Sequence, residues 1–229
     1  MISGSSSTKD SSLVDFNVGF VIFPGITQLD FTGPFEVLGR LGTPPLISVP
    51  SKFPQSRTHV IAKTMLEVSS DRGLVIMPTC TFDSSPLLDL ICVPGGAGVV
   101  EALVDVETVD FTRRQGDQAQ YVTSVCMGAF LLGAAGLLKG RWATTHWAYT
   151  DLLPLVGASH EKARVVRDGN VFTSAGVSAG IDFAFSVVGE LAGPEVAQVI
   201  QLGIEYDPSA PFDAGHPDKA PEAATALMV

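Results

Sequence analysis

The sequence predicts an α/β protein, a three-layer α/β/α sandwich around a mostly parallel sheet. Apolar runs rich in β-branched residues alternate with longer segments of helical character, which is the order of strands and crossover helices in layered α/β domains. Several runs are almost continuously apolar, as expected of parallel strands buried on both faces. The chain has 229 residues, 46% of them hydrophobic, which is enough for one such domain with a sizeable core.

The strands and helices of the first half follow from apolar runs and the turn residues between them. Residues 16–23 form an apolar strand that ends at Pro24-Gly25. A helix follows within residues 31–41 and is expected to be regular from about Pro34, because proline is tolerated in the first turn. Asp30 then lies just ahead of this helix. The later elements are a long proline-rich loop at 42–56, a strand at 58–62, a hairpin of 66–68 with 74–77, and a strand at 88–93.

The second half repeats the alternation. A glycine-rich turn, residues 94–98, follows the strand at 88–93, but it lacks the glycine spacing of nucleotide-binding loops. The further elements are a helix at 106–119, a strand at 121–125, a helix ending near Lys139-Gly140, a short element at 143–145, a helix at 148–153, a hairpin of 164–168 with 171–174, and helices at 180–191 and 194–202.

One domain is expected, over residues 16–217. Residues 1–15 are polar and predicted to be disordered, and residues 218–229 are predicted to form a short C-terminal tail. No apolar stretch reaches the roughly 18 residues of a spanning helix, which argues against membrane insertion. The three cysteines cannot all pair, and without a signal peptide they indicate reduced thiols and a cytoplasmic location. The net charge of −10 argues against nucleic acid and favours a small, uncharged substrate.

Cys126 is the candidate nucleophile. It ends a β-branched run, and Gly128 opens the following apolar helix, which is the outline of a nucleophile elbow. The first N–H groups of that helix point toward the cysteine and can stabilise a thiolate or a negative charge on a substrate. The competing interpretation is a buried structural cysteine. The position between strand and helix favours the nucleophile.

Asp30 is the candidate acid/base, because in an open α/β sheet it meets Cys126 at the carboxyl ends of the strands. The alternative is a plain N-terminal cap of the following helix. The backbone N–H groups of Gly96 and Met127 are candidate donors to developing charge. Thr32, Gly95 and Val177 are expected to line the pocket.

His146 is a possible partner of Cys126, although a histidine packed beside Trp147 fits the sequence better. The three cysteines and four histidines show no metal-ligand spacing, so no metal site is expected.

Several motifs together resemble the ThiJ/PfpI superfamily, whose fold is class I glutamine-amidotransferase-like, a flavodoxin-like arrangement. Within the superfamily the chain is most similar to the isocyanide hydratases, which carry aspartate where other members carry glutamate. The resemblance covers roughly residues 17–217, and its specific parts are Leu29-Asp30 and residues 121–126, 133–138, 143–149 and 179–184.

This resemblance implies a hydro-lyase that converts an isocyanide and water to an N-formamide without a cofactor, as a homodimer with the site near the interface. Cys126 would form a thioimidate with the substrate, and Asp30 would move the protons. Met127 departs from the family, which carries a threonine after the nucleophile.

Two alternatives stay open. One is a ThiJ/PfpI-type hydrolase or deglycase, which would be expected to carry glutamate in place of Asp30. The other is a non-enzymatic redox sensor using Cys126.

Overall fold

The computed structural model describes residues 15–41 and 56–228. Its main sheet has seven strands in the order β10-β11-β7-β6-β1-β2-β5. All neighbours are parallel except β10 and β11, which form an antiparallel hairpin at one edge. The strands are β1 (Phe16–Val21), β2 (Ser56–Ala62), β5 (Cys80–Thr81), β6 (Leu90–Val93), β7 (Tyr121–Val125), β10 (Val165–Asp168) and β11 (Val171–Ser174).

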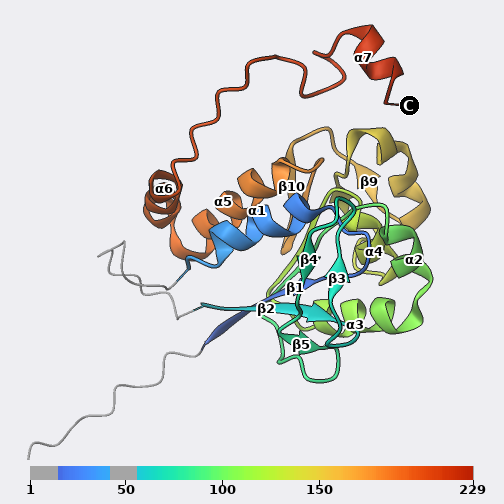
Figure 1. The fold of residues 1–229 in the computed structure, drawn as a ribbon, viewed down its shortest axis with the longest axis vertical. Coiled ribbons are helices and arrows are strands. Elements are labelled where there is room, and N and C mark those ends of the chain that lie inside the picture. The colour runs from blue at the N-terminus through green and yellow to red at the C-terminus, as the bar shows by residue number, and fades with distance from the viewer. Residues whose placement is uncertain (1–14, 42–55, 229) are drawn as a thin grey trace, which may run out of the picture.

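Helices cover both faces of this sheet (Figure 1). Helices α1 (Gln28–Leu38), α5 (Ala179–Ala192) and α6 (Pro194–Gly203) form one layer. Helices α2 (Val99–Val104), α3 (Val106–Gly116) and α4 (Gly128–Ala134) form the other. The predicted three-layer α/β/α sandwich is therefore confirmed. None of the helices in the described residues is long and apolar enough to cross a membrane.

Smaller elements surround the carboxyl ends of the strands. A hairpin of β3 (Val68–Ser69) and β4 (Val75–Ile76) confirms the one predicted near these residues. A short parallel pair joins β8 (Trp142–Ala143) to β9 (Ser159–His160), and the 3₁₀ helix η1 (Trp147–Val156) connects them. Helix α7 (Glu222–Ala226) lies in the expected C-terminal tail. The sequence does not predict strands β5 and β9 or helix α7, since each is five residues or fewer and carries little periodic signal.

Helix α1 starts earlier than the sequence suggests. It begins at Gln28, and Pro34 lies inside it. Phe31 and Phe35 pack against Phe20 of β1, with ring centroids 5.5 and 5.3 Å from that of Phe20, and this burial stabilises helical geometry ahead of the proline. The predicted position of Asp30 ahead of the helix is therefore wrong, because Asp30 lies in its first turn.

Helix α4 differs in the opposite sense, ending at Ala134 instead of near Lys139-Gly140. Gly136 adopts a φ of 82°, a left-handed conformation that ends helices. Residues 42–55 of the loop predicted at 42–56 lie outside the described residues. Residues 1–14 of the segment expected to be disordered also lie outside them.

Candidate functional site

Cys126 occupies a sharp turn between β7 and α4. Its φ is 55°, its side chain is nearly buried, and its N–H donates to the carbonyls of Ser174 and Ala175 at 3.0 and 3.1 Å. The Thr145 hydroxyl donates to the Cys126 carbonyl at 2.7 Å. A β-carbon at Gly128 would lie 2.0 Å from the Val93 carbonyl oxygen, so this close approach requires glycine. Contacts from three separate segments thus hold a conformation that a non-glycine residue rarely adopts.

Asp30 is fully buried beside this turn, at 0% exposure. Its Oδ2 accepts the Gly95 N–H at 3.0 Å, and its side chain makes no capping bond to α1. A β-carbon at Gly95 would lie 2.9 Å from Asp30 Oδ2, 3.0 Å from Cys126 Cβ and 2.5 Å from the Met127 nitrogen. The missing side chain at Gly95 therefore lets the acid, the nucleophile and the first N–H of the elbow converge. The helix-cap interpretation of Asp30 does not hold, because the cap position belongs to Thr27.

The acid and the thiol share a buried environment that disfavours charge on either. Burial raises the pKa of Asp30 to about 7, although the Gly95 N–H and the Cys126 thiol hydrogen bond to the carboxylate and lower it. Burial, together with the negative charge of Asp30, raises the pKa of Cys126 to about 12. Near neutral pH the pair therefore holds between one and two protons, and a proton can pass from sulfur to carboxylate.

Two backbone N–H groups oppose these effects at the sulfur. The N–H groups of Met127 and Val177 hydrogen bond to Cys126 and lower its pKa. Stabilisation of the thiolate by the elbow is thus present, but burial and the charge of Asp30 outweigh it in the resting protein. Val177 also has a positive φ of 22°, which sequence alone does not reveal. The sequence suggested it only as a pocket residue.

Two other predicted site residues, Gly96 and Thr32, make contacts outside the pair of Asp30 and Cys126. Gly95, and not Gly96, donates to Asp30. Gly96 has a φ of 120°, and its α-carbon packs so tightly that a β-carbon would lie 2.3 Å from the Thr27 nitrogen. The Thr32 hydroxyl donates to the Gln28 carbonyl within α1 at 3.0 Å, and Thr32 does not line the pocket described next.

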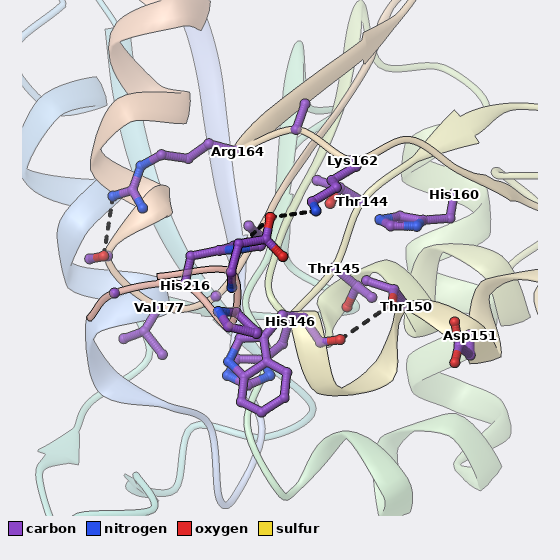
Figure 2. A pocket seen from close by; sticks show the side chains of 18 residues that line it. Thr144, Thr145, His146, Thr150, Asp151, His160, Lys162, Arg164, Val177 and His216 are labelled. Carbon is purple, nitrogen blue, oxygen red and sulfur yellow. Dashed lines mark hydrogen bonds and ion pairs between the residues drawn. The ribbon is translucent and has the colours of Figure 1, made fainter. Parts of the chain in front are cut away.

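A pocket of about 740 Å³ adjoins the elbow. Stretches of chain within residues 144–151, 160–164, 175–178 and 215–218 surround it (Figure 2). We call it the Val177 pocket, because Val177 lines it and also hydrogen bonds to the Cys126 sulfur. It lies beyond the carboxyl end of β11, where ligands of open α/β sheets bind.

His146 lines this pocket without bonding to the nucleophile. Its ring packs against Trp147 and Tyr149, with centroids 5.5 and 5.7 Å away, and its Nδ1 accepts the Ala148 N–H at 3.3 Å. Burial lowers its pKa, which favours the neutral ring. The structure thus supports a packed histidine and not a Cys–His pair. Within the described residues, no group of three or more His, Cys, Asp or Glu side chains could hold a metal.

The sequence and the fold are similar to those of known proteins. The DJ-1/PfpI family matches residues 17–190. An isonitrile hydratase from Pseudomonas putida is 52% identical over 206 residues, which cover 90% of this chain and 85% of that protein. A crystal structure of a THiJ/PfpI family protein from Pseudomonas syringae superposes with a TM-score of 0.86 at 41% identity, covering 93% of this chain and 84% of that one. Drosophila melanogaster DJ-1beta shares the fold, with a TM-score of 0.72 at 23% identity over 84% of this chain and 98% of that one.

Proposed function

The chain belongs to the DJ-1/PfpI family, and from this premise we propose that it is an isocyanide hydratase that converts an isocyanide and water to an N-formamide. The observation that carries the proposal is the 52% identity to the Pseudomonas putida isonitrile hydratase over most of both chains. The buried pair of Cys126 and Asp30 supports it chemically, because the reaction needs a nucleophile for carbon and a group that moves protons. Both are side chains, so the proposed reaction needs no cofactor.

In the proposed first step, the sulfur of Cys126 attacks the terminal carbon of the isocyanide. Its proton passes to the Asp30 carboxylate and from there to the same carbon. The product is a thioimidate, R–N=CH–S, whose sulfur is that of Cys126. The hydrogen that was on this sulfur is now on the carbon. The N–H groups of Met127 and Val177 stabilise the sulfur as its charge develops.

In the proposed second step, water adds across the C=N bond. Asp30 takes a proton from the water and delivers it to nitrogen, which gives R–NH–CH(OH)–S on the cysteine. The carbon–sulfur bond then breaks, and the hydroxyl proton passes to the leaving sulfur, which gives the formamide and the free thiol. Asp30 Oδ1 is the atom suited to this task, because it is buried without a hydrogen-bond partner in the described part of the chain, while Oδ2 is held by Gly95. One carboxyl group can thus serve both steps.

The direct test is to incubate the purified protein with a simple aryl or alkyl isocyanide and follow formamide formation. Acid quench during turnover should trap the covalent adduct. Mass spectrometry should then show the peptide that contains Cys126 heavier by the mass of one isocyanide. No formamide from any isocyanide would refute the proposed function. An adduct on Cys80 or Cys92 would move the reaction to another thiol.

The rate should depend on pH through the shared proton of Cys126 and Asp30. When both groups are protonated there is no base to activate the thiol, so activity requires loss of the first proton. We expect kcat/KM to rise about tenfold per pH unit below the pKa of Asp30, about 7, and to level off above it. The measurement is kcat/KM for a neutral alkyl isocyanide between about pH 5 and 9, corrected for uncatalysed hydration. A flat profile would contradict the proton transfer.

Replacement of Met127 should have a small effect, because the N–H that reaches the sulfur belongs to its backbone. The side chain is partly buried against the core and offers only a weak acceptor. Met127→Thr should change kcat/KM by about tenfold or less, which corresponds to about 1.4 kcal/mol. Met127→Leu is the matched control, because it keeps the volume without a hydroxyl. If the natural protein is inert and Met127→Thr is active, the hydroxyl is essential and this chain has another function.

The alternatives have less support. A hydrolase or deglycase of this family would be expected to carry glutamate in place of Asp30. A redox sensor requires a reactive thiolate, whereas burial raises the pKa of Cys126.

We also propose that the protein is a cytoplasmic homodimer that binds neither nucleic acid nor membranes. Light scattering coupled to size-exclusion chromatography measures the oligomeric state.

A further inference from the structure

The Val177 pocket is built on the residues that hold the nucleophile. Val177 lines it and donates its N–H to the Cys126 sulfur. Thr145 lines it and donates its hydroxyl to the Cys126 carbonyl. Cys126 and Asp30 do not line the pocket themselves, so the substituent of a substrate bonded to this sulfur would reach it past Val177 and Thr145. Its volume of about 740 Å³ suits a substituent larger than a small alkyl group.

The walls of the pocket favour a flat, uncharged group. The rings of His146, Trp147, His160 and His216 line it (Figure 2). Both lining cations are engaged elsewhere. Lys162 pairs with Asp218, and Arg164 pairs with Asp182 and donates to the Ser178 hydroxyl.

Asp151 is the remaining charged group of the lining, and it forms no ion pair with any described residue. The pocket thus presents an unpaired negative charge and, among the described residues, no unpaired lysine or arginine, which disfavours an anionic substituent. Aromatic walls favour a ring that can stack on them.

One wall comes from the end of the chain. In the described residues after Asp207, the backbone N–H groups donate hydrogen bonds only to residues of this same C-terminal segment. Lys219 and Ala220, for example, donate to the His216 carbonyl. The segment leaves α6 and runs along the upper side of the molecule, as drawn, to α7 (Figure 1). Within the described residues, the ion pair between Lys162 and Asp218 is its single polar link to the rest of the chain past Asp207. The wall formed by residues 215–218 is thus held mainly by one exposed ion pair.

We propose that the Val177 pocket receives an uncharged aromatic substituent of the isocyanide, and that residues 215–218 form an openable wall, latched by Lys162 and Asp218, that limits the size of this substituent. The inference rests on the proposed function. It adds the substrate class and two residues that determine specificity without taking part in the chemistry.

The preferred substituent is tested by comparing kcat/KM for phenyl, 4-carboxyphenyl and methyl isocyanide. We expect phenyl to exceed 4-carboxyphenyl by more than tenfold. Ala163→Phe should lower kcat/KM for phenyl isocyanide by more than tenfold and leave methyl isocyanide unchanged, because Ala163 lines the pocket and a methyl group does not need the volume that the new side chain would fill. Equal effects on the two substrates, or none on either, would overturn the assignment of the pocket.

The latch is tested with a bulkier probe, 1-naphthyl isocyanide. An exposed ion pair is a weak contact, so Lys162→Met should raise the naphthyl-to-methyl ratio of kcat/KM by only about two- to fivefold. Charge reversal, Lys162→Asp with Asp218→Lys, should restore the ratio. Lys219→Met is the matched control, because Lys219 pairs with Asp213 inside the same segment. Equal ratios in Lys162→Met and Lys219→Met would overturn the latch.

A second measurement separates this inference from the proposed function. The rate of Cys126 alkylation by N-methylmaleimide and by N-(1-pyrenyl)maleimide, mapped by peptide mass, reports access to the sulfur without any isocyanide. Lys162→Met should raise the pyrenyl-to-methyl ratio and Ala163→Phe should lower it, even if no isocyanide is hydrated. Unchanged ratios, or no reaction of Cys126 with either reagent in any variant, would refute the pocket as the approach to the thiol.

Discussion

Cys126→Ala is expected to abolish formamide production, a loss of about 10⁴-fold or more, because the proposed covalent intermediate cannot form without the sulfur. Alanine keeps the β-carbon and removes one nearly buried atom. The turn is held by bonds from the Cys126 backbone to residues 145, 174 and 175, and alanine keeps all of them. The measurement is kcat with an aryl isocyanide, together with circular dichroism to establish that the fold is intact.

Cys80→Ala is the matched control for this variant. Cys80 is half-buried on β5 at the far edge of the sheet, so its removal should leave the rate unchanged. Turnover by Cys126→Ala at the rate of the natural protein would exclude the covalent mechanism. Loss of activity in both variants would mean that thiol replacement acts through folding.

Asp30→Asn should lower kcat by about 10²- to 10⁴-fold, because a positioned group that transfers protons contributes that much. Asparagine can still accept the Gly95 N–H through its amide oxygen, so the geometry of the site is kept while the ionisable group is lost. A rate close to that of the natural protein would show that Asp30 only supports the structure. Asp89→Asn is the control, because Asp89 accepts the Asn17 N–H at 2.7 Å and lies at the amino end of β6, opposite the site.

The stability of Asp30→Asn offers an independent check. A free aspartate has a pKa of 3.8, whereas burial raises the pKa of Asp30 to about 7, so between these values only the folded state keeps the proton. The natural protein should therefore lose stability as the pH rises through this window, whereas the asparagine variant does not lose this contribution. The variant's advantage, on the order of 4 kcal/mol at most, should grow from about pH 4 to about pH 7 in denaturant titrations.

The elements that the sequence specified well are those whose burial pattern is local. The central strands are largely apolar, and the turn residues Pro24-Gly25 and Pro94-Gly95 follow the ends of two of them. Because β1, β6 and β7 are adjacent and parallel, the residues after each one gather at the same edge. This is why the order of strands and turns is enough to place Asp30, Gly95 and Cys126 together.

The start of α1 and the donor set at the sulfur depended on contacts that the sequence does not display. Phe20 lies in β1, and its packing against Phe31 outweighs the helix-breaking tendency of Gly33-Pro34. Val177 follows β11, and its N–H reaches Cys126 because β11 and β7 are neighbours in the sheet. Both effects couple residues far apart in the chain.

The sequence by itself thus determined the layered fold, the elbow at Cys126 and the meeting of that thiol with Asp30, because hydrophobic periodicity and turn residues act over a few neighbouring positions. Only the tertiary structure decided how the pair ionises, since the pKa values of Asp30 and Cys126 follow from burial by many segments and from their mutual charge. It also brought residues 215–218 against the pocket. Burial and long-range contact are sums over the whole fold, and no local pattern carries them.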